Sequence, residues 1–292
     1  MKTLIENYIT HLKLSNASEN TIRSYRGYLL DFARFADKLD VEAIEAYLGV
    51  LHNRQFSKAS TRRALATLKS FGRWMVNENL IPENPVAAFR PPRVRAHIPQ
   101  RLTEEQARQL CDGPVRTPFP ERDRLILELL YGSGVRCDEV ASLRVEDILE
   151  ADVLLVSKGK GDKQRNVLMT DYAQRLLKIY LWKRKRILRN RARKGDKREV
   201  TGLFFALQGP QIDALSSKSV FRTVVAIAKD AGLPWVSPHD LRRAFATHMA
   251  EHGAPHIVIS RLLGHAKLST TEGYIAAASP DRLKKAYARA RG

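Results

Sequence analysis

Cysteine is scarce in this chain, which has two in 292 residues, Cys111 and Cys137. Two thiols at this spacing form neither a disulfide framework nor a set of zinc ligands. Long apolar runs are missing as well: none approaches the ~20 residues that span a bilayer, and the N-terminus lacks the apolar core of a signal peptide. These absences exclude a disulfide-rich secreted domain and a membrane-spanning protein, and they predict a cytoplasmic protein with reduced thiols.

Acidic residues are also few beside the basic ones. The chain has 31 Asp and Glu against 50 Lys and Arg, a net charge of +19 and a pI near 10.1. Such an excess predicts a polyanionic partner. A membrane surface is also anionic, but the lack of apolar runs favours nucleic acid. The length allows two domains, each with its own core.

Residues 1–90 predict a small helical domain. Apolar residues recur at helical spacing in three segments, which we expect to begin near Ser18, Val41 and Ser60. The simplest interpretation of the aromatic residues here is core packing. Basic residues lie on the opposite faces, where they meet either DNA phosphates or only solvent. The DNA-binding candidates from this domain are Arg62 and Arg63.

A basic linker is predicted at residues 91–100, where prolines remove amide donors and disfavour helix. Its Arg93 and Arg95 are candidates for contact with a DNA backbone. Thr103 to Gln106 has the form of a capping box that opens a second domain, residues 101–292.

The second domain is predicted to be mainly helical with a small sheet, so the fold class is mainly α with an α+β second domain. Two β-type runs, 152–156 and 166–169, flank a Gly-containing turn and predict a hairpin. The stretch 182–198 is extremely basic, and its ordinary interpretation is a solvated helix end and loop. Contact with DNA is the alternative, with four candidates: Lys183, Arg184, Lys185 and Arg186.

Three separate segments supply side chains suited to phosphate chemistry. They contain Arg136 with Glu139, His239 with Arg242, and His265 with Tyr274. Arginine forks phosphate oxygens, histidine hydrogen-bonds a phosphate or moves protons, and tyrosine can attack it. In a chain this basic, the set predicts covalent phosphoryl transfer on nucleic acid without a metal.

Local signals indicate how the chain presents these residues. Asp138 is expected to cap the helix that follows Arg136. Pro238 and Asp240 predict a helix start that puts His239 and Arg242 on one face.

Further signals concern the C-terminal region. Pro255 predicts a short helix that Gly264 closes, with His265 just beyond its end. Ser269 to Glu272 is a second capping box, which would carry Tyr274 on the first helical turn.

The order of these motifs resembles that of the tyrosine recombinase (phage-integrase) family. The order is an arginine before a helix, a lysine in a hairpin, His239-x-x-Arg242, Leu263-Gly264-His265 and a later tyrosine. The chain is most similar to the family's compact Xer-type members. The resemblance covers nearly the whole chain, because the patterns at Asn20-Thr21 and Phe71-x-x-Trp74 are similar to the family's helical core-binding (SAM-like) domain. It implies that residues 101–292 form the catalytic domain.

The resemblance implies a role for each residue of the set. Tyr274 attacks the scissile phosphate and leaves a 3′-phosphotyrosine with a free 5′ hydroxyl. Arg136, Arg242 and His265 stabilise the pentacoordinate transition state.

The remaining roles concern protons and support. His239 assists proton handling, and Lys160 in the hairpin loop protonates the leaving oxygen. On composition alone Lys158 and Lys163 could take the same role, and the resemblance favours Lys160. The loop is not a P-loop, because no Gly-x4-Gly-Lys-Ser/Thr occurs. Glu139 supports Arg136 from behind, although a plain surface salt bridge between the two would explain the same pattern.

The partner implied is duplex DNA with paired half-sites. A homotetramer of C-shaped clamps would hold two sites, alone or with a related recombinase or accessory protein. No cofactor is expected, because the covalent link keeps the phosphodiester energy. We expect a cytoplasmic, nucleoid-associated enzyme; the target sequence stays open, as does the process, whether chromosome segregation or transposon, plasmid or phage recombination.

Other interpretations of the same residues stay open. A type IB topoisomerase shares this chemistry but acts as a monomer, and an architectural protein or repressor would carry an inactive site. His248 to His252 matches the His-x-x-Glu-His pattern of a zinc peptidase, although no clear third ligand follows. A helix predicted at Ser279-Pro280 either packs on its own domain or docks into a neighbouring protomer.

Overall fold

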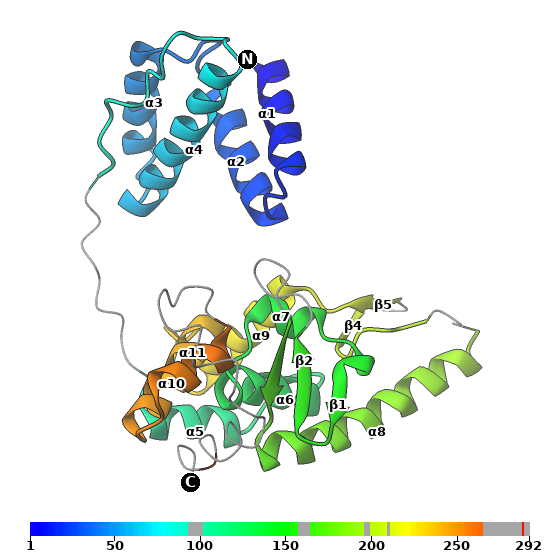
Figure 1. Ribbon diagram of the computed structural model, residues 1–292. Helices are drawn as coiled ribbons and strands as arrows, with labels where there is room; N and C mark the ends of the chain where they lie inside the picture. Colours follow the sequence, from blue (N-terminus) through cyan, green and yellow to red (C-terminus); the bar gives the residue numbers. More distant parts are fainter. Residues whose placement is uncertain (93–101, 157–163, 196–198, 209–210, 265–287, 289–292) are drawn as a thin grey trace. The chain divides into compact units, whose positions relative to one another are not determined.

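The computed structural model describes residues 1–92, 102–156, 164–195, 199–208, 211–264 and 288. The chain divides into two compact units, Met1–Ile98 and Pro99–Gly292, and each has its own buried core (Figure 1). The predicted linker residues Arg93 and Arg95 lie outside the described residues. The fold class is confirmed: helices dominate, and the sheets are small and antiparallel.

The first unit is a bundle of four helices. They are α1 (Lys2–Leu14), α2 (Glu19–Phe32), α3 (Val41–Asn53) and α4 (Lys58–Asn77). The three predicted segments are confirmed, and each begins at a side-chain cap, since Ser18, Asp40 and Ser57 accept hydrogen bonds from backbone amides of the first turn. Most of the aromatic residues lie in the core, as interpreted, but Phe35 and Phe56 are exposed. Arg62 and Arg63 are exposed on α4.

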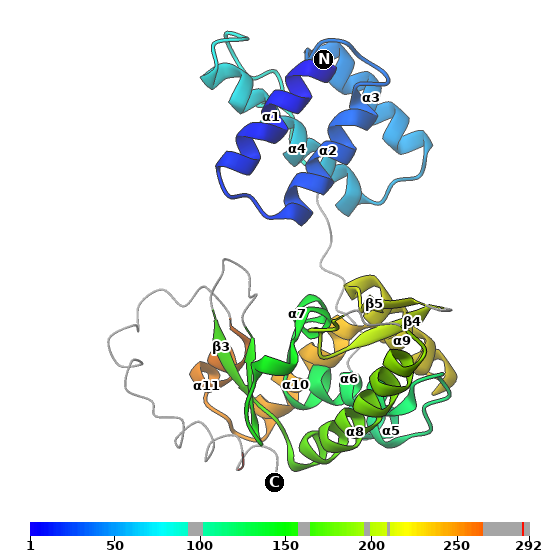
Figure 2. The same ribbon diagram turned by 90° about the vertical axis from the view of Figure 1, so that its right-hand side faces the viewer.

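The second unit is built around α6 (Pro120–Gly132), whose leucine-rich middle is buried on all sides. Figure 2 shows α6 between α8 (Asp171–Arg193) and α10 (Pro238–Glu251). Over its described residues the unit also has α5 (Glu104–Asp112), α7 (Cys137–Ser142), α9 (Ser217–Asp230) and α11 (His256–Leu263), with a 3-10 turn, η1 (Val145–Asp147). The capping box that opens α5 is present, formed by Thr103 and Gln106.

The predicted hairpin is confirmed as β2 (Val153–Val156) and β3 (Arg165–Leu168), which pair antiparallel. A third strand, β1 (Ile148–Glu150), extends this sheet on the β2 side. A separate hairpin of β4 (Phe205–Gln208) and β5 (Gln211–Ala214) was not anticipated from the sequence. A small apolar cluster, including Leu168, Phe245 and Leu262, packs β2 and β3 against α10 and α11. This packing brings β3 next to the end of α11.

Two of the four basic candidates on α8 are used within the fold. The guanidinium of Arg184 donates to the carbonyls of Val200 at 2.6 Å, Gly202 at 2.7 Å and Leu203 at 3.2 Å. The ammonium of Lys183 pairs with Glu121. Arg184 thus holds the chain that returns from α8, and Lys183 holds the start of α6. Contact with DNA stays a prediction for both side chains. Lys185 and Arg186 are exposed, and their predicted contact with DNA stands.

Neutralising neighbouring residues of α8 should separate these two uses. Arg184→Met leaves backbone carbonyls without a charged donor, so we expect a loss of about 2 kcal/mol in the free energy of unfolding and little change in the salt dependence of DNA binding. The matched variant Lys185→Met should keep its stability and lower the slope of log K against log salt by about 0.9. Denaturant titration and binding at several salt concentrations measure both. The reverse pattern would contradict the assignment.

Candidate active site

Arg136 lies at the N-terminus of α7, after a turn that only glycine fits. Gly134 has φ +65°, and a Cβ built there would lie 2.5 Å from a ring carbon of Phe245. The Arg136 guanidinium donates from Nη1 to Glu139 Oε1 at 2.8 Å and from Nη2 to the Gly264 carbonyl at 3.2 Å. The close approach of the turn to α10 and α11 thus fixes where Arg136 projects.

The cap of α7 is not the predicted one. Asp138 is exposed, and it is the Glu139 carboxylate that accepts the Arg136 amide, at 2.8 Å. A glutamate three residues into a helix can reach back to the N-cap amide, whereas Asp138 is too close in sequence to the free amides. Glu139 thereby holds both the backbone and the side chain of Arg136, so the predicted salt bridge exists but has no solvent-exposed carboxylate.

Arg242 comes from the first turns of α10, where the predicted start at Pro238 is confirmed and Ser237 with Asp240 forms a capping box. Its side chain is buried. Nη1 donates to the Gly134 carbonyl and Nη2 to the Leu263 carbonyl at 2.5 Å. His239 is on the same helix face and is exposed.

A third arginine, Arg165, completes the network and was missed in the sequence. It begins β3, and its two terminal nitrogens each lie 2.7 Å from one oxygen of Glu139; its Nε donates to the Leu262 carbonyl at 3.0 Å. A signal did exist: strand alternation puts Arg165 on the same face as the fully buried Val167. A charge on that face requires a buried partner.

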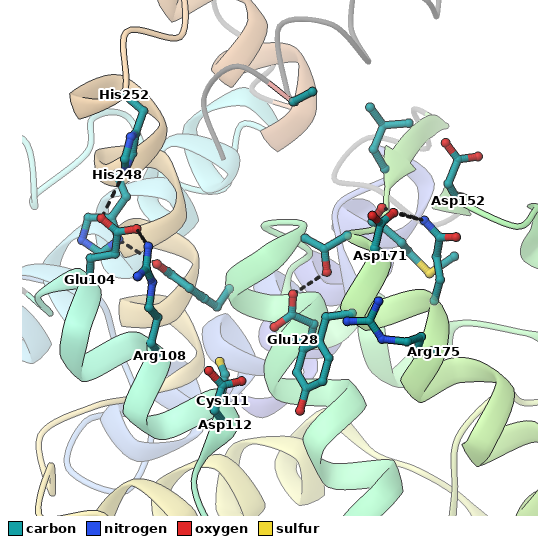
Figure 3. A pocket seen from close by; sticks show the side chains of 17 residues that line it. Glu104, Arg108, Cys111, Asp112, Glu128, Asp152, Asp171, Arg175, His248 and His252 are labelled. Carbon is teal, nitrogen blue, oxygen red and sulfur yellow. Dashed lines mark hydrogen bonds and ion pairs between the residues drawn. The ribbon is translucent and has the colours of Figure 1, made fainter. Parts of the chain in front are cut away.

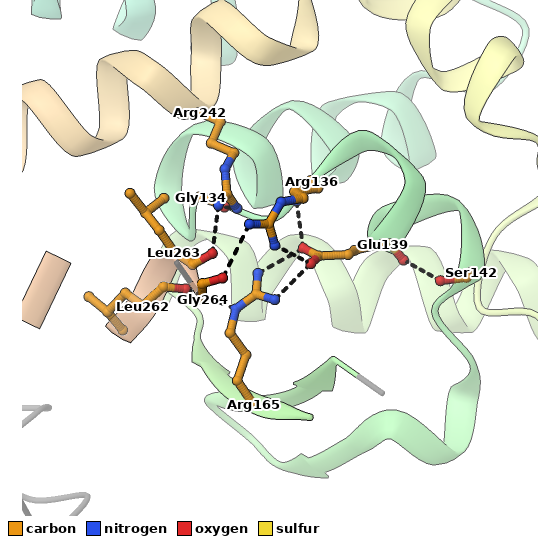
Figure 4. A network of polar contacts seen from close by, with 9 residues as sticks. All are labelled: Gly134, Arg136, Glu139, Ser142, Arg165, Arg242, Leu262, Leu263 and Gly264. Carbon is orange, nitrogen blue, oxygen red and sulfur yellow. Dashed lines mark hydrogen bonds and ion pairs between the residues drawn. The ribbon is translucent and has the colours of Figure 1, made fainter. Parts of the chain in front are cut away.

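The last carbonyls of α11 hold all three arginines (Figure 4). Leu262 accepts from Arg165, Leu263 from Arg242 and Gly264 from Arg136. The final carbonyls of a helix have no intrahelical donor and carry its partial negative charge. They therefore orient the guanidinium groups without neutralising them.

The charges in this network do not cancel. Among the described residues, three guanidinium groups surround one buried carboxylate, that of Glu139, and the exposed carboxylate of Asp138 adds only a smaller effect on Arg242. Burial, then the nearby charge of Arg136, lowers the pKa of Arg242 to about 9, so a neighbouring like charge supplies part of the shift. Burial alone would raise the pKa of Glu139, but hydrogen bonds from Arg165 and from the Arg136 amide outweigh it and bring the pKa down to about 2. The arrangement suits the binding of an anion.

Three predicted residues, Lys160, His265 and Tyr274, lie outside the described residues, as does the helix expected at Ser279-Pro280. The structure does describe the strands on either side of Lys160 and the helix that precedes His265. The lysine loop joins β2 to β3, next to Arg165. The predicted short helix is confirmed as α11, and Gly264 ends it with φ +62°, so His265 follows the carbonyl that holds Arg136.

The zinc-peptidase pattern does not form a metal site. Both ring nitrogens of His248 are engaged inside the protein, Nδ1 with the Tyr131 hydroxyl at 3.1 Å and Nε2 with the Leu102 carbonyl at 3.0 Å, while His252 pairs with Glu104 at 3.2 Å. Among the described residues, no group of three His, Cys, Asp or Glu side chains is placed to hold a metal ion.

The two histidines line a pocket of about 600 Å³, with residues of α5, α6 and α8 (Figure 3). Its charged lining is mostly acidic, and two arginines, Arg108 and Arg175, lie among the carboxylates of Glu104, Asp112, Glu128, Asp152 and Asp171. None of the arginines of the network lines this pocket.

Within the described part of the chain, no helix is long and apolar enough to cross a membrane.

Comparison with known proteins gives the arginine network its context. Residues 100–280 match the phage integrase family, and residues 5–79 match the N-terminal SAM-like domain of phage integrases. The chain belongs to the phage integrase family of tyrosine recombinases. It is thus an enzyme of site-specific DNA recombination, and both of its units have counterparts in the family.

Relatives and solved structures agree with this assignment. A tyrosine recombinase XerC of Thermodesulfovibrio yellowstonii is 35% identical over 277 residues, covering 92% of this chain and 90% of the relative. A tyrosine recombinase XerA of Thermococcus onnurineus is 34% identical and covers 99% and 95%. The fold is similar to a lambda integrase tetramer bound to a Holliday junction, with a TM-score of 0.70 at 20% identity over 94% of this chain and 79% of the integrase chain.

Because of Glu139, the free energy of unfolding should depend on pH in the acidic range. Its pKa is about 2 in the folded chain and about 4.3 when unfolded, so its contribution is complete above pH ~4.3 and is lost as the pH falls toward 2. The loss should reach about 3 kcal/mol. In Glu139→Gln the unfolding free energy should fall less steeply between pH 5 and 2.

The exposed pair of Arg144 and Glu146 provides the control. Glu146→Gln should keep the wild-type pH dependence, because exposed ion pairs contribute little. Denaturant titrations across this pH range measure all three proteins. Equal slopes in wild type and Glu139→Gln would show that the network does not depend on this carboxylate.

Proposed function

We propose that this recombinase cleaves and rejoins duplex DNA through a 3′-phosphotyrosine on Tyr274 and exchanges strands between two sites held in a tetramer. The observation that carries the proposal is the pair of guanidinium groups, Arg136 and Arg242, held by neutral carbonyls above a single buried carboxylate. Such a pair can fork the non-bridging oxygens of a phosphodiester. Family membership supplies the reaction class.

In the proposed step, the Tyr274 oxygen attacks the scissile phosphorus and the bond from phosphorus to the 5′ oxygen breaks. The phenolic proton leaves with the help of His239, and Lys160 gives a proton to the departing 5′ oxygen. Arg136, Arg242 and His265 stabilise the charge that develops on the non-bridging oxygens. Attack by a 5′ hydroxyl of the partner site reverses the chemistry and releases the tyrosine, so no nucleotide cofactor is consumed.

The partner proposed is a DNA site with two half-sites, each bound by both units of one chain. The exposed side chains Arg62, Arg63, Lys185 and Arg186 are proposed to contact its phosphates. Relatives named XerC and XerD, and the likeness to an integrase tetramer on a Holliday junction, support action as a tetramer on two sites. We place this activity in the cytoplasm, at the nucleoid.

The nucleophile is tested by Tyr274→Phe. A suicide substrate with a nick near the cleavage site traps the covalent adduct, because the cleaved fragment diffuses away. We expect wild type to form the adduct and Tyr274→Phe to form none while binding the same DNA with similar affinity, since only the attacking oxygen is removed. Adduct in the variant would exclude Tyr274 as the nucleophile, and lost binding would make the tyrosine structural.

Exchange between sites is tested with two labelled duplexes. Recombinant product from wild type supports strand exchange in a synapse. Relaxation of supercoils without recombinant product would instead indicate a topoisomerase, and DNA binding without any adduct would indicate an architectural protein or repressor.

Cleavage should also survive chelation. The proposal assigns charge stabilisation to Arg136, Arg242 and His265, so the rate of adduct formation should be the same with and without EDTA. A rate that falls with EDTA and returns with Mg²⁺ or Zn²⁺ would show that a metal ion supplies part of this charge.

A further inference from the structure

Arg165 connects three elements of the site, although nothing assigns it a part in the reaction. It projects from β3 and grips both oxygens of Glu139, which belongs to α7. Its Nε holds the Leu262 carbonyl at the end of α11. Figure 4 shows it on the side of Glu139 away from Arg242. One side chain thus fixes α7 and α11 relative to β3.

The geometry makes Arg165 a poor candidate for direct contact with DNA. Its side chain is 10% exposed, against 25% for Arg136, and all three of its guanidinium nitrogens already donate to protein acceptors. Any effect of Arg165 on the reaction must therefore pass through the groups that it holds.

The group most affected is the Glu139 carboxylate. Each of its oxygens accepts one hydrogen bond from Arg165 and one from Arg136, whose amide binds Oε2 and whose Nη1 binds Oε1. Without Arg165, half of these hydrogen bonds would be lost from a fully buried carboxylate. A buried carboxylate that has lost half of its hydrogen bonds attracts the nearest cation more strongly. Within this network, the cations that would remain are Arg136 and Arg242.

Charge balance leads to the same point. A phosphodiester carries one negative charge and gains a second in a pentacoordinate transition state. Arg136, Arg165 and Arg242 against Glu139 leave two net positive charges in the network. Loss of Arg165 would leave one, and the Glu139 carboxylate would then compete with the phosphate for the fork of Arg136.

We propose that Arg165 is a positioning residue for cleavage: it occupies the Glu139 carboxylate so that Arg136 and Arg242 stay available to the scissile phosphate, and it fixes the end of α11. This inference rests on the proposed function, because it requires the two arginines to act on that phosphate. Binding of DNA does not depend on Arg165; the rate of the chemical step does.

The test compares Arg165→Gln and Arg165→Lys in the full-length protein. Single-turnover adduct formation on the nicked suicide substrate should slow about 100-fold in Arg165→Gln, the size of effect expected from misplaced catalytic groups. DNA affinity should stay within about twofold. Arg165→Lys should recover part of the rate, since it keeps the charge but not the two-point grip. Arg144→Gln, which removes an exposed arginine, serves as the matched control and should cleave like wild type.

A double-mutant cycle identifies the route of the effect. If Arg165 acts through Glu139, then Arg165→Gln should slow cleavage much less in a Glu139→Gln background than in wild type. Additive losses would overturn the proposal and indicate an independent contact. An unchanged rate in Arg165→Gln, or a lower thermal stability with an unchanged rate, would overturn it as well. If Arg165→Gln does not fold, the partial rate of Arg165→Lys and its coupling to Glu139→Gln decide by the same criteria.

The wild-type arm separates this inference from the proposed function. No adduct with wild type would overturn both, and DNA bound without cleavage would then indicate an inactive site. Adduct with wild type and none with Tyr274→Phe would uphold the proposed function, and the Arg165 variants would then judge the inference by itself.

Discussion

The buried carboxylate of Glu139 is the group on which the arrangement of the site depends. A carboxylate without solvent must be matched by donors, and here they come from two elements, the start of α7 through Arg136 and the start of β3 through Arg165. Because the donors are distant in sequence, the charge can be satisfied only when the sheet and the helices are in place. The same ion network therefore contributes to the fold and orients Arg136, the residue that the proposed mechanism places at the scissile phosphate.

Much of the fold could be predicted because its signals are local. The caps of α2, α3 and α5, the start of α10 at Pro238 and the end of α11 at Gly264 each depend on a few neighbouring residues. The β2–β3 hairpin follows from two apolar runs around a turn. By contrast, β1 is short and largely solvent-facing, so its sequence offers no apolar pattern to detect.

Less of the candidate site than of the fold could be predicted from the sequence. The motifs identified Arg136, Glu139, His239 and Arg242 by family resemblance, but the contacts between them are tertiary. The ion pair of Glu139 with Arg165 joins residues 26 positions apart, and Arg184 looked like its basic neighbours until the returning chain provided carbonyls for it. Net charge thus overstates the surface that is free for DNA, because some arginines are internal parts of the fold.

The end of α11 has a consequence for how quickly the site can respond to its substrate. Arg242 is held by the carbonyl dipoles of Gly134 and Leu263, whereas Arg136 is held by the Gly264 carbonyl and also by the Glu139 carboxylate. An arginine held mainly by a carboxylate must break an ion pair before it can turn to a phosphate. Dipoles impose a much smaller reorganisation energy, since they direct the cation without compensating its charge. The helix terminus therefore acts as a fixed polar environment for Arg242, already oriented before DNA arrives.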